Sequence, residues 1–530
     1  MAATYGAPGV YIEEPPSGSM PLQGVGTAVA AFVGFTAGYN TDEGDPTDPD
    51  GVRPQLVTSW PQFERIYGGF APGIFLPHAV KGFFENGGST CFIVRIPTPS
   101  DGRPQRALPA AGRQQIETLT VEALDPAVSC EVVIEPPPHE QGQEPPGQEF
   151  TLKVLQDGQV KEDYPGVSLG RGQRGVEKLV NEQSKLIKVE VHSVSGLSLA
   201  ERVPAPGRYS LEPAKPAADA VSPQQFQGSE TSRTGYEGLA VAEDVTIVAI
   251  PDLVTVATRA DGSFDGELYV AAQGQLVDWC ERSRTRMAIL DSPPGLNAQG
   301  ALEWRNSLGK DSAFGAAYYP HLVVPNPLAR PGATNGEQFL AIPPSGHVAG
   351  VWARTDTMRG VWKAPANEVC RGVTRLAADV TTGEQELLNP KQVNCIRAFG
   401  SNGIRIWGAR TLASTDQSWR YINVRRLFIF IEETIRRGTQ WVVFEPNDAD
   451  LWARVRRTVD AFLHGLWLQG ALVGATPRQA FFILCDESNN PQSSVDEGKL
   501  VVDIGVAPVK PAEFVIFRIS QWQGGASTSE

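Results

Sequence analysis

The chain has 530 residues, enough for about three domains with substantial cores. Its net charge of −14 argues against a general nucleic-acid-binding protein, because such a protein needs positive charge to bind the phosphate backbone. It has no run of 18 apolar residues and no basic segment leading into an apolar one, so we expect neither a membrane span nor a secretory signal.

The cysteines are widely spaced and form no C-x-x-C pair, and no histidine lies at zinc spacing from them. They are Cys91, Cys130, Cys280, Cys370, Cys395 and Cys485. We therefore expect buried, reduced thiols, with no bound metal and no cofactor.

Residues 1–27 are expected to form an N-terminal arm and a linker. Val10, Tyr11 and Ile12 make a short strand between a Pro-Gly turn and two consecutive prolines. The Pro/Gly-rich segment that follows could reach at most about 45 Å when extended. A strand on such a tether is better suited to pairing with another copy than to closing within one core.

Residues 28–100 and 236–345 show the alternation of apolar runs and amphipathic segments that is typical of a parallel α/β sheet. The runs expected as strands are 28–35, 91–96, 245–250, 287–290 and 314–324. Helices are expected from a cap at Thr58 or Ser59 to Gly68, and at 77–85, 266–284 and 298–308.

Residues 101–235 differ in composition and are expected to form an inserted β-rich domain at the surface. They contain a Pro/Glu/Gln-rich stretch at 135–148, short alternating strands at 150–155 and 186–194, and a Pro/Ala segment at 203–220. The sequence GRGQRG at 170–175 matches a dinucleotide-binding pattern and precedes a helical stretch at 176–184. Because a turn-rich loop at 163–170 precedes it, instead of a buried strand, we interpret it as a loop.

We expect no catalytic residue, because the histidines stand outside known catalytic motifs. They are His78, His139, His192, His321, His347 and His464. His464 lies in an otherwise apolar helix, a setting typical of a structural role.

Residues 346–507 are expected to form a C-terminal domain with a mixed sheet. One helix begins at Asp416 or Ser418 and ends at Gly438, and a second is capped by Asn447 or Asp448. A buried strand is expected at 441–444, and further strands are expected at 481–485 and 499–506. The inward side chains of the second helix are Leu451, Val455, Val459, Phe462, Leu463 and Leu466.

Residues 508–530 are expected to form a C-terminal arm that pairs with a neighbouring copy. Val515, Phe517 and Ile519 share one face of its strand, and Phe514 and Ile516 share the other. On the second helix, Arg454, Arg456 and Arg457 form a basic cluster. Two interpretations stay open for this cluster, a solvated face or a docking site for an acidic strip on a partner.

The motifs along the chain resemble those of the contractile tail sheath family of phage tails and phage-tail-like injection particles. They are residues 8–14 (PGVYIEE), 24–27 (GVGT), 31–34 (AFVG), 180–187 (VNEQSKLI), 343–350 (PPSGHVAG), 363–366 (KAPA), 388–390 (LNP), 407–411 (WGART), 443–447 (VFEPN), 505–508 (GVAP) and 511–514 (PAEF). Their order and spacing cover nearly the whole chain, but the 101–235 insertion is variable in the family, so no function carries over to it.

This resemblance implies a multidomain α/β (α+β) sheath subunit that polymerises as stacked hexameric rings around an inner tube. The arms would add strands to neighbouring subunits, and residues 346–507 would form the inner wall, with the three arginines facing the tube. Contraction would drive the tube through a target envelope. The implied partners are further copies of the chain, the tube, the baseplate and terminal cap proteins, without nucleic acid or direct membrane insertion.

The resemblance further implies assembly in the cytoplasm as part of a virion or of a phage-tail-like particle that is released or retained. Two alternatives were weighed against the sheath subunit. One is an α/β enzyme that binds a nucleotide, and the other is a tube or shell protein that does not contract.

Overall fold

The structure is a computed structural model. It describes residues 22–518 except 41–42, 46, 49, 98–103, 112, 125–129, 138–146, 157, 194–195, 212–220, 260, 330–333 and 335. The described chain divides into two compact units. The core unit comprises residues 24–361 and 365–433, and the C-terminal unit comprises residues 22–23, 362–364 and 434–518.

The core unit is built on a nine-stranded sheet. Its strands, in order, are β16 (Glu368–Val369), β19 (Ile404–Ile406), β18 (Val393–Ala398), β13 (Gly315–Tyr319), β12 (Met287–Asp291), β11 (Ile247–Ala249), β1 (Ala30–Gly34), β3 (Cys91–Arg95) and β2 (Gln55–Val57). The six central strands from β18 to β3 run parallel, while β2 pairs antiparallel with β3, and β19 pairs antiparallel with both β18 and β16. The expected parallel α/β sheet is thus present, with antiparallel edges.

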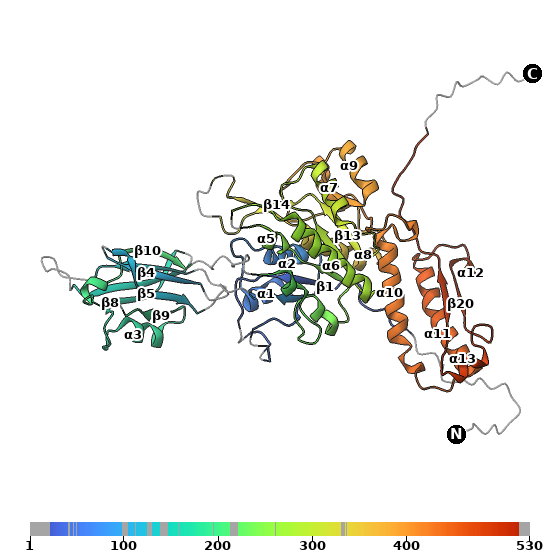
Figure 1. Cartoon of the computed structure of the whole chain (residues 1–530), viewed down its shortest axis with the longest axis horizontal. Coiled ribbons are helices and arrows are strands. Elements are labelled where there is room, and N and C mark those ends of the chain that lie inside the picture. Colours follow the sequence, from blue (N-terminus) through green and yellow to red (C-terminus); the bar gives the residue numbers. More distant parts are fainter. Residues whose placement is uncertain are drawn as a thin grey trace, which may run out of the picture. The chain divides into compact units, whose positions relative to one another are not determined.

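Helices cover both faces of this sheet (Figure 1). The helices α2 (Leu76–Glu85) and α8 (Ser345–Arg359) pack against each other and on β1, β11 and β12. The helices α6 (Gly266–Ser283) and α7 (Ala298–Leu308) pack against each other and on β12 and β18. Right-handed crossovers that move in opposite directions along the sheet place these pairs on opposite faces. The central strands are therefore buried on both sides, which explains their continuous apolar runs.

A three-stranded sheet and four further helices complete this part of the core unit. A three-stranded sheet has the order β15 (Phe339–Ile342), β14 (Leu322–Pro325) and β17 (Arg375–Leu376). The other helices are α1 (Trp60–Tyr67), α4 (Pro223–Gln227), α5 (Leu253–Ala257) and α9 (Thr382–Leu388). The run 314–324, expected as one strand, is split between β13 and β14, which belong to different sheets.

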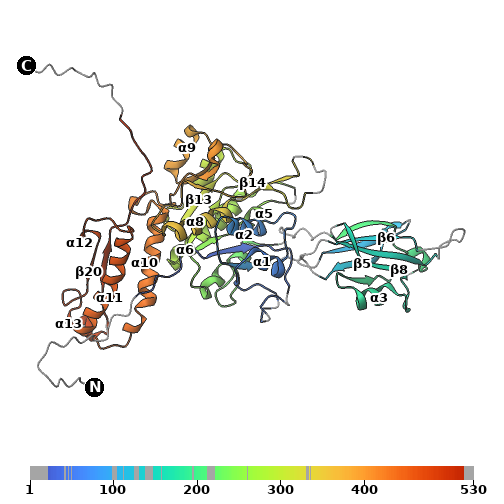
Figure 2. The ribbon, with the colours of Figure 1, turned by 180° about the vertical axis from the view of Figure 1, so that it is seen from behind.

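The β-rich part, which runs from β4 to β10, contains two antiparallel sheets around a core of its own. One has the order β10 (Gly207–Leu211), β6 (Cys130–Glu135), β7 (Glu149–Gln156) and β8 (Gln159–Ser168), and the other β4 (Gln105–Ala110), β5 (Arg113–Ala123) and β9 (Ile187–Val191). The helix α3 (Val176–Gln183) packs on β8 and β9 (Figure 2). The apolar core runs from Leu108 to Leu211 and contains none of the residues that fill the core around the nine-stranded sheet.

The β-rich part is shorter than the expected 101–235. Phe226 is buried against Phe35 of the large core, with ring centroids 5.5 Å apart, and Val221 and Tyr236 belong to the same core. The boundary therefore falls between Leu211 and Val221 instead of at residue 235. Composition misplaced this boundary because residues 222–234 are polar in sequence, with Phe226 as their one aromatic side chain.

The C-terminal unit is smaller. The helix α10 (Ile422–Gly438) ends in it, and it contains α11 (Ala449–Leu468), α12 (Pro477–Ala480), α13 (Gln492–Asp496), β20 (Phe481–Leu484) and β21 (Asp503–Val506). Asp448 caps α11 by accepting a hydrogen bond of 2.8 Å from the Leu451 N–H. The expected inward residues of α11 are buried except Phe462, which is half-buried.

Three expectations for the last third of the chain are corrected. The helix expected from Asp416 or Ser418 begins at Ile422, because Asp416 caps only a short 3₁₀ turn. Residues 441–444 form no buried strand, since 440–442 is a 3₁₀ turn and the Phe444 side chain is fully exposed. The start expected at residue 346 is not a fold boundary either, because α8, β18 and β19 belong to the core unit.

Candidate functional site

The C-terminal arm leaves the C-terminal unit as an exposed apolar segment. Its start is held to the unit by a hydrogen bond of 3.3 Å from the Val509 N–H to the Ala471 carbonyl. Beyond it, residues 511–518 adopt no helix or strand. The exposed fractions of its apolar side chains are 72% for Phe514, 69% for Val515, 78% for Ile516 and 82% for Phe517. Such a continuous exposed run indicates an interaction site.

A small sheet in the same unit has room for further strands. β20 and β21 pair antiparallel with Phe481 opposite Val506 and Leu484 opposite Asp503, and the described residues add no third strand. Phe482 on β20 is 61% exposed. Because a two-stranded sheet is only marginally stable alone and its edges present backbone groups, this sheet can accept strands from other chains.

The other expected arm residues, Val10, Tyr11, Ile12 and Ile519, lie outside the described residues. The linker that follows the N-terminal arm is described from Leu22 onward. Thr27, near its end, donates a hydrogen bond of 2.6 Å from Oγ1 to Oδ2 of Asp356. The Thr27 carbonyl accepts hydrogen bonds from Nη2 of Arg426, at 2.8 Å, and from Oγ1 of Thr246, at 2.5 Å.

The contacts of Thr27 centre on a buried ion pair. Arg426 on α10 and Asp356 on α8 are 3% and 4% exposed, and their closest N–O distance is 2.6 Å. The Arg426 guanidinium also lies 4.9 Å from the centre of the Trp352 ring. Burial raises the pKa of Asp356, while the arginine and Thr27 act in the opposite direction. Sequence reasoning missed this cluster because Thr27 and Asp356 are 329 positions apart and no motif joins them.

The three arginines expected to face a tube do not form one free cluster. Arg454 pairs with Glu445 at 3.0 Å and lies over the Trp441 ring, 5.4 Å from its centre. Arg456 is exposed but donates a hydrogen bond of 3.1 Å to the Cys485 carbonyl. Arg457 is exposed, and its side chain has no hydrogen bond or ion pair with the described residues. Consecutive helical residues are about 100° apart, so Arg454 and Arg456 point in different directions.

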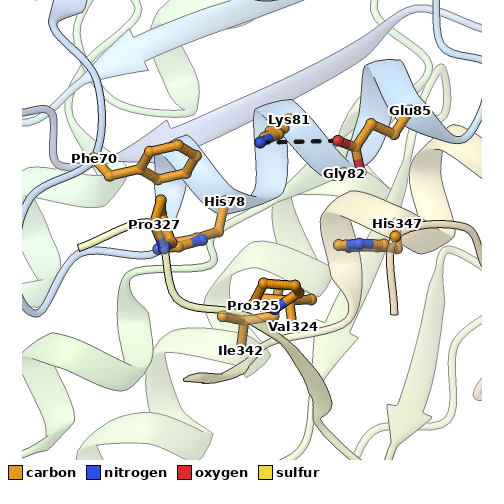
Figure 3. A pocket seen from close by; sticks show the side chains of 11 residues that line it. Phe70, His78, Lys81, Gly82, Glu85, Val324, Pro325, Pro327, Ile342 and His347 are labelled. Atoms are coloured by element: carbon orange, nitrogen blue, oxygen red, sulfur yellow. Dashed lines mark ion pairs between the residues drawn. The ribbon is translucent and has the colours of Figure 1, made fainter. Parts of the chain in front are cut away.

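A cavity of about 360 Å³ lies between α2, α8 and β14 (Figure 3). Two buried histidines, His78 and His347, line it together with the apolar residues Val324, Pro325 and Ile342. Lys81 pairs with Glu85 across one turn of α2 at 3.9 Å. Burial lowers the pKa of His78 to about 3 and that of His347 to about 4, so both are weak bases. The described residues that line the cavity include no serine, threonine or cysteine, and its other ionisable groups are Lys81 and Glu85, which pair with each other.

The glycine pattern at 170–175 lies in a different setting from the one expected. Residues 163–168, expected as part of a loop, are the end of β8, which pairs antiparallel with β7. Gly175 precedes α3, and its N–H donates to the Gly172 carbonyl at 3.0 Å, so the turn closes on itself. A dinucleotide site requires a buried parallel strand before the helix, so this turn lacks its context.

The six cysteines are buried and form no disulfide, and the described residues contain no group of three or more metal-ligating side chains. No helix described there is long and apolar enough to cross a bilayer. The exposed apolar arm and the incomplete sheet beside it are therefore the strongest functional features.

Comparison with known proteins agrees with the motifs. Two family models match neighbouring parts of the chain, the "Phage tail sheath protein central domain" at residues 250–412 and the "Phage tail sheath C-terminal domain" at residues 414–521. The tail sheath protein of Vibrio phage KVP40 is 30% identical over 177 residues, which are 33% of this chain and 26% of that protein. The tail sheath protein of Burkholderia phage BcepMu is 27% identical over 235 residues, 43% of this chain and 48% of that protein. These matches span less than half the length of either relative.

Solved structures match the fold over nearly the whole chain. The helical sheath of the anti-feeding prophage in its contracted state gives a TM-score of 0.56 at 24% identity, covering 98% of this chain and 100% of that chain. The sheath complex of the PVC extracellular contractile injection system, also contracted, gives 0.55 at 23% identity, covering 98% and 99%. The family models, the curated relatives and the shared fold agree. The chain belongs to the contractile tail sheath family.

Proposed function

We propose that this chain is the sheath subunit of a contractile injection particle, which polymerises as stacked hexameric rings around an inner tube. Membership of the tail sheath family supports the class of protein. The matched structures include a contracted helical sheath and a baseplate with six-fold symmetry, which support the helical and hexameric assembly. The proposed role is structural, in keeping with the tail sheath proteins that the chain matches.

The observation that carries the proposal is the exposed run Phe514–Phe517 on a unit that also holds a two-stranded sheet. In a single subunit the apolar run stays exposed and the described sheet has only two strands. If the arm of one subunit adds to the sheet of another, the arm's apolar side chains are buried and the sheet gains strands. The N-terminal arm, with Val10, Tyr11 and Ile12, is proposed to add a second strand in the same way.

The energy of such pairing accumulates along the polymer. Each backbone hydrogen bond contributes about 0.5–1.5 kcal/mol net, and each shared strand makes several of them. Contraction of the polymer would then move subunits relative to one another while the shared strands keep them connected. The proposed partners are further copies of the chain, the inner tube, the baseplate and a terminal cap. Assembly is proposed to occur in the cytoplasm, as part of a phage tail or tail-like particle.

The test is to express the chain with its tube and baseplate and to image the particles by electron microscopy. We expect sheaths of two lengths, a long narrow form with tube inside and a short wide form. Deletion of residues 1–18 should leave a folded subunit that does not polymerise. Particles of a single length under every trigger would favour the alternative, a tube or shell protein that does not contract. Long polymers from the truncated chain would exclude the proposed role of the N-terminal arm.

A further inference from the structure

The loop between α10 and α11 exposes two neighbouring apolar side chains. Val443 is 65% exposed and Phe444 is 103% exposed, so the Phe444 ring contacts almost nothing in its own subunit. Phe444 also has φ of +68°, in the left-handed region that bulky side chains rarely adopt. A strained backbone that presents a fully exposed aromatic ring is a feature in need of a function.

The loop is fixed on both sides of Phe444. The Glu445 carboxylate pairs with Arg454 at 3.0 Å, and Arg454 lies over the Trp441 ring. Asn447 donates a hydrogen bond of 2.9 Å to the Lys499 carbonyl and accepts one of 2.7 Å from Nε1 of Trp452. The exposed ring is therefore held in place before any partner binds, which reduces the entropy lost on binding.

Neither burial nor a side-chain hydrogen bond of Phe444 within the subunit offsets the backbone strain. Phenylalanine cannot form the local hydrogen bonds that make asparagine tolerable in this region. Backbone hydrogen bonds from Val443 to Gln440 and from Glu445 to Val442 hold the loop in this conformation, and burial of the ring against a partner would add stabilisation that the isolated subunit lacks. Aromatic side chains are enriched at the centres of protein interfaces, where one ring can bury about 150–250 Å².

We propose that Phe444, with Val443, is an anchor that binds a second copy of this chain at the apolar surface formed by Leu468 and Val473. This inference rests on the proposed sheath polymer. A helical polymer of identical subunits uses two different surfaces of each subunit, which join head to tail. Leu468 and Val473 are 68% and 54% exposed and lie at the far end of α11.

The positions of the two surfaces fit a repeating contact. They lie at opposite ends of the 20-residue helix α11, about 30 Å apart along its axis. Both belong to the C-terminal unit, so one rigid helix fixes their separation. The Val509 N–H bonds to the Ala471 carbonyl, so the C-terminal arm departs beside Leu468 and Val473. The anchor contact would thus continue the interface proposed for the arm.

The experiment uses the full chain expressed with its tube. Phe444→Asp and Leu468→Asp should each reduce the sedimentable polymer at least tenfold, while the thermal midpoint of the isolated subunit stays at the wild-type value. Phe444→Gly should also reduce the polymer, but with an unchanged or higher midpoint, because glycine relieves the strain. Val160→Asp is the control, since Val160 is 53% exposed but lies in the β-rich part. That variant should polymerise normally.

Four results would overturn the inference. Wild-type polymer yields from Phe444→Asp would show that the ring is not needed, and the proposed function would stand if the arm deletion still blocks assembly. Normal sheaths of Phe444→Asp that lack their tube would show that the ring binds the tube instead of a second copy of the chain. A lowered thermal midpoint for Phe444→Asp would place the ring in the subunit's own core. If the wild-type chain forms no polymer with its tube, both this contact and the proposed function are wrong.

Discussion

Asp356 and Arg426 lie 70 positions apart and form a two-pronged ion pair, with Nη1–Oδ1 at 2.8 Å and Nη2–Oδ2 at 2.6 Å. The same guanidinium holds the Thr27 carbonyl, and the same carboxylate holds the Thr27 hydroxyl. The pair therefore joins α8, α10 and the root of the N-terminal arm.

Removing the charge of Asp356 should destabilise the core unit. Asp356→Asn leaves Arg426 buried without a counter-ion, which costs about 3–5 kcal/mol of unfolding free energy. Chemical denaturation of the isolated subunit measures this loss. The control is Glu43→Gln, which removes an exposed pair with Arg65 whose side chains are 48% and 57% exposed, and which should change stability little. Equal effects of the two variants would contradict the prediction.

Asp252 should make the core unit less stable as pH rises. It is fully buried and accepts hydrogen bonds from the backbone N–H groups of Phe35, at 2.7 Å, of Leu76, at 3.2 Å, and of Phe75. Burial raises its pKa to about 7. Because the folded chain favours the protonated carboxyl, this stabilisation is complete below about pH 4 and is lost as pH rises to about 7.

Asp252→Asn mimics the protonated carboxyl and should abolish this part of the pH dependence. Between pH 4 and 7, the unfolding free energy of the wild type should fall relative to that of the variant by about 1.4 kcal/mol per pH unit. Denaturation curves of both chains across this range provide the measurement. Parallel pH profiles would mean that the three N–H donors keep the Asp252 carboxylate ionised.

A charge in the C-terminal arm should block assembly without affecting the subunit. Phe517→Asp places a carboxylate where the arm is proposed to meet a neighbour's sheet, and an unpaired buried charge is strongly unfavourable. Phe517 is 82% exposed in the single subunit, so the thermal midpoint should not change. The control Ala512→Asp adds the same charge before the apolar run and should still assemble. Unfolding of the Phe517→Asp subunit would place this strand in the subunit's own core.

The β-rich part should be removable, provided that the cut respects its core. Replacement of residues 102–217 by a short linker removes one complete apolar core and should give folded subunits that polymerise into thinner tubes. Replacement of residues 102–232 also removes Phe226 from its contact with Phe35 and should lower the thermal midpoint. Failure of the shorter deletion to assemble would show that the β-rich part packs between subunits.

Arg457 is the best remaining candidate for contact with the tube. Arg457→Glu should give sheaths that form empty or contract early, because the exposed arginine would no longer attract acidic groups on the tube. Arg456→Glu is the comparison, since it would place a carboxylate beside Asp486 and Glu487 and should destabilise the subunit itself. Normal filled particles from Arg457→Glu at ordinary salt would mean that Arg457 belongs to a solvated face.

Sequence determined the features that depend on neighbouring residues. The apolar runs of β1, β3 and β12 predicted a parallel sheet because strands buried on both faces are apolar at every position. Asp448 and Gly438 marked helix ends because capping chemistry is local. The family could be recognised for a related reason, since its motifs keep their order and spacing along the chain.

Only the tertiary structure decided what depends on distant residues. The contact of Phe226 with Phe35 places residues 221–241 in the large core. Folding also brings Thr27 to the ion pair of Asp356 and Arg426. Arg454 pairs with Glu445 and is thereby separated from Arg456 and Arg457. In the structure Phe444 is fully exposed, although it lies in a segment whose apolar residues predicted a buried strand. Hydrophobicity indicates that a side chain gains by burial, but the packing of the whole chain decides whether that burial occurs within one subunit or between two.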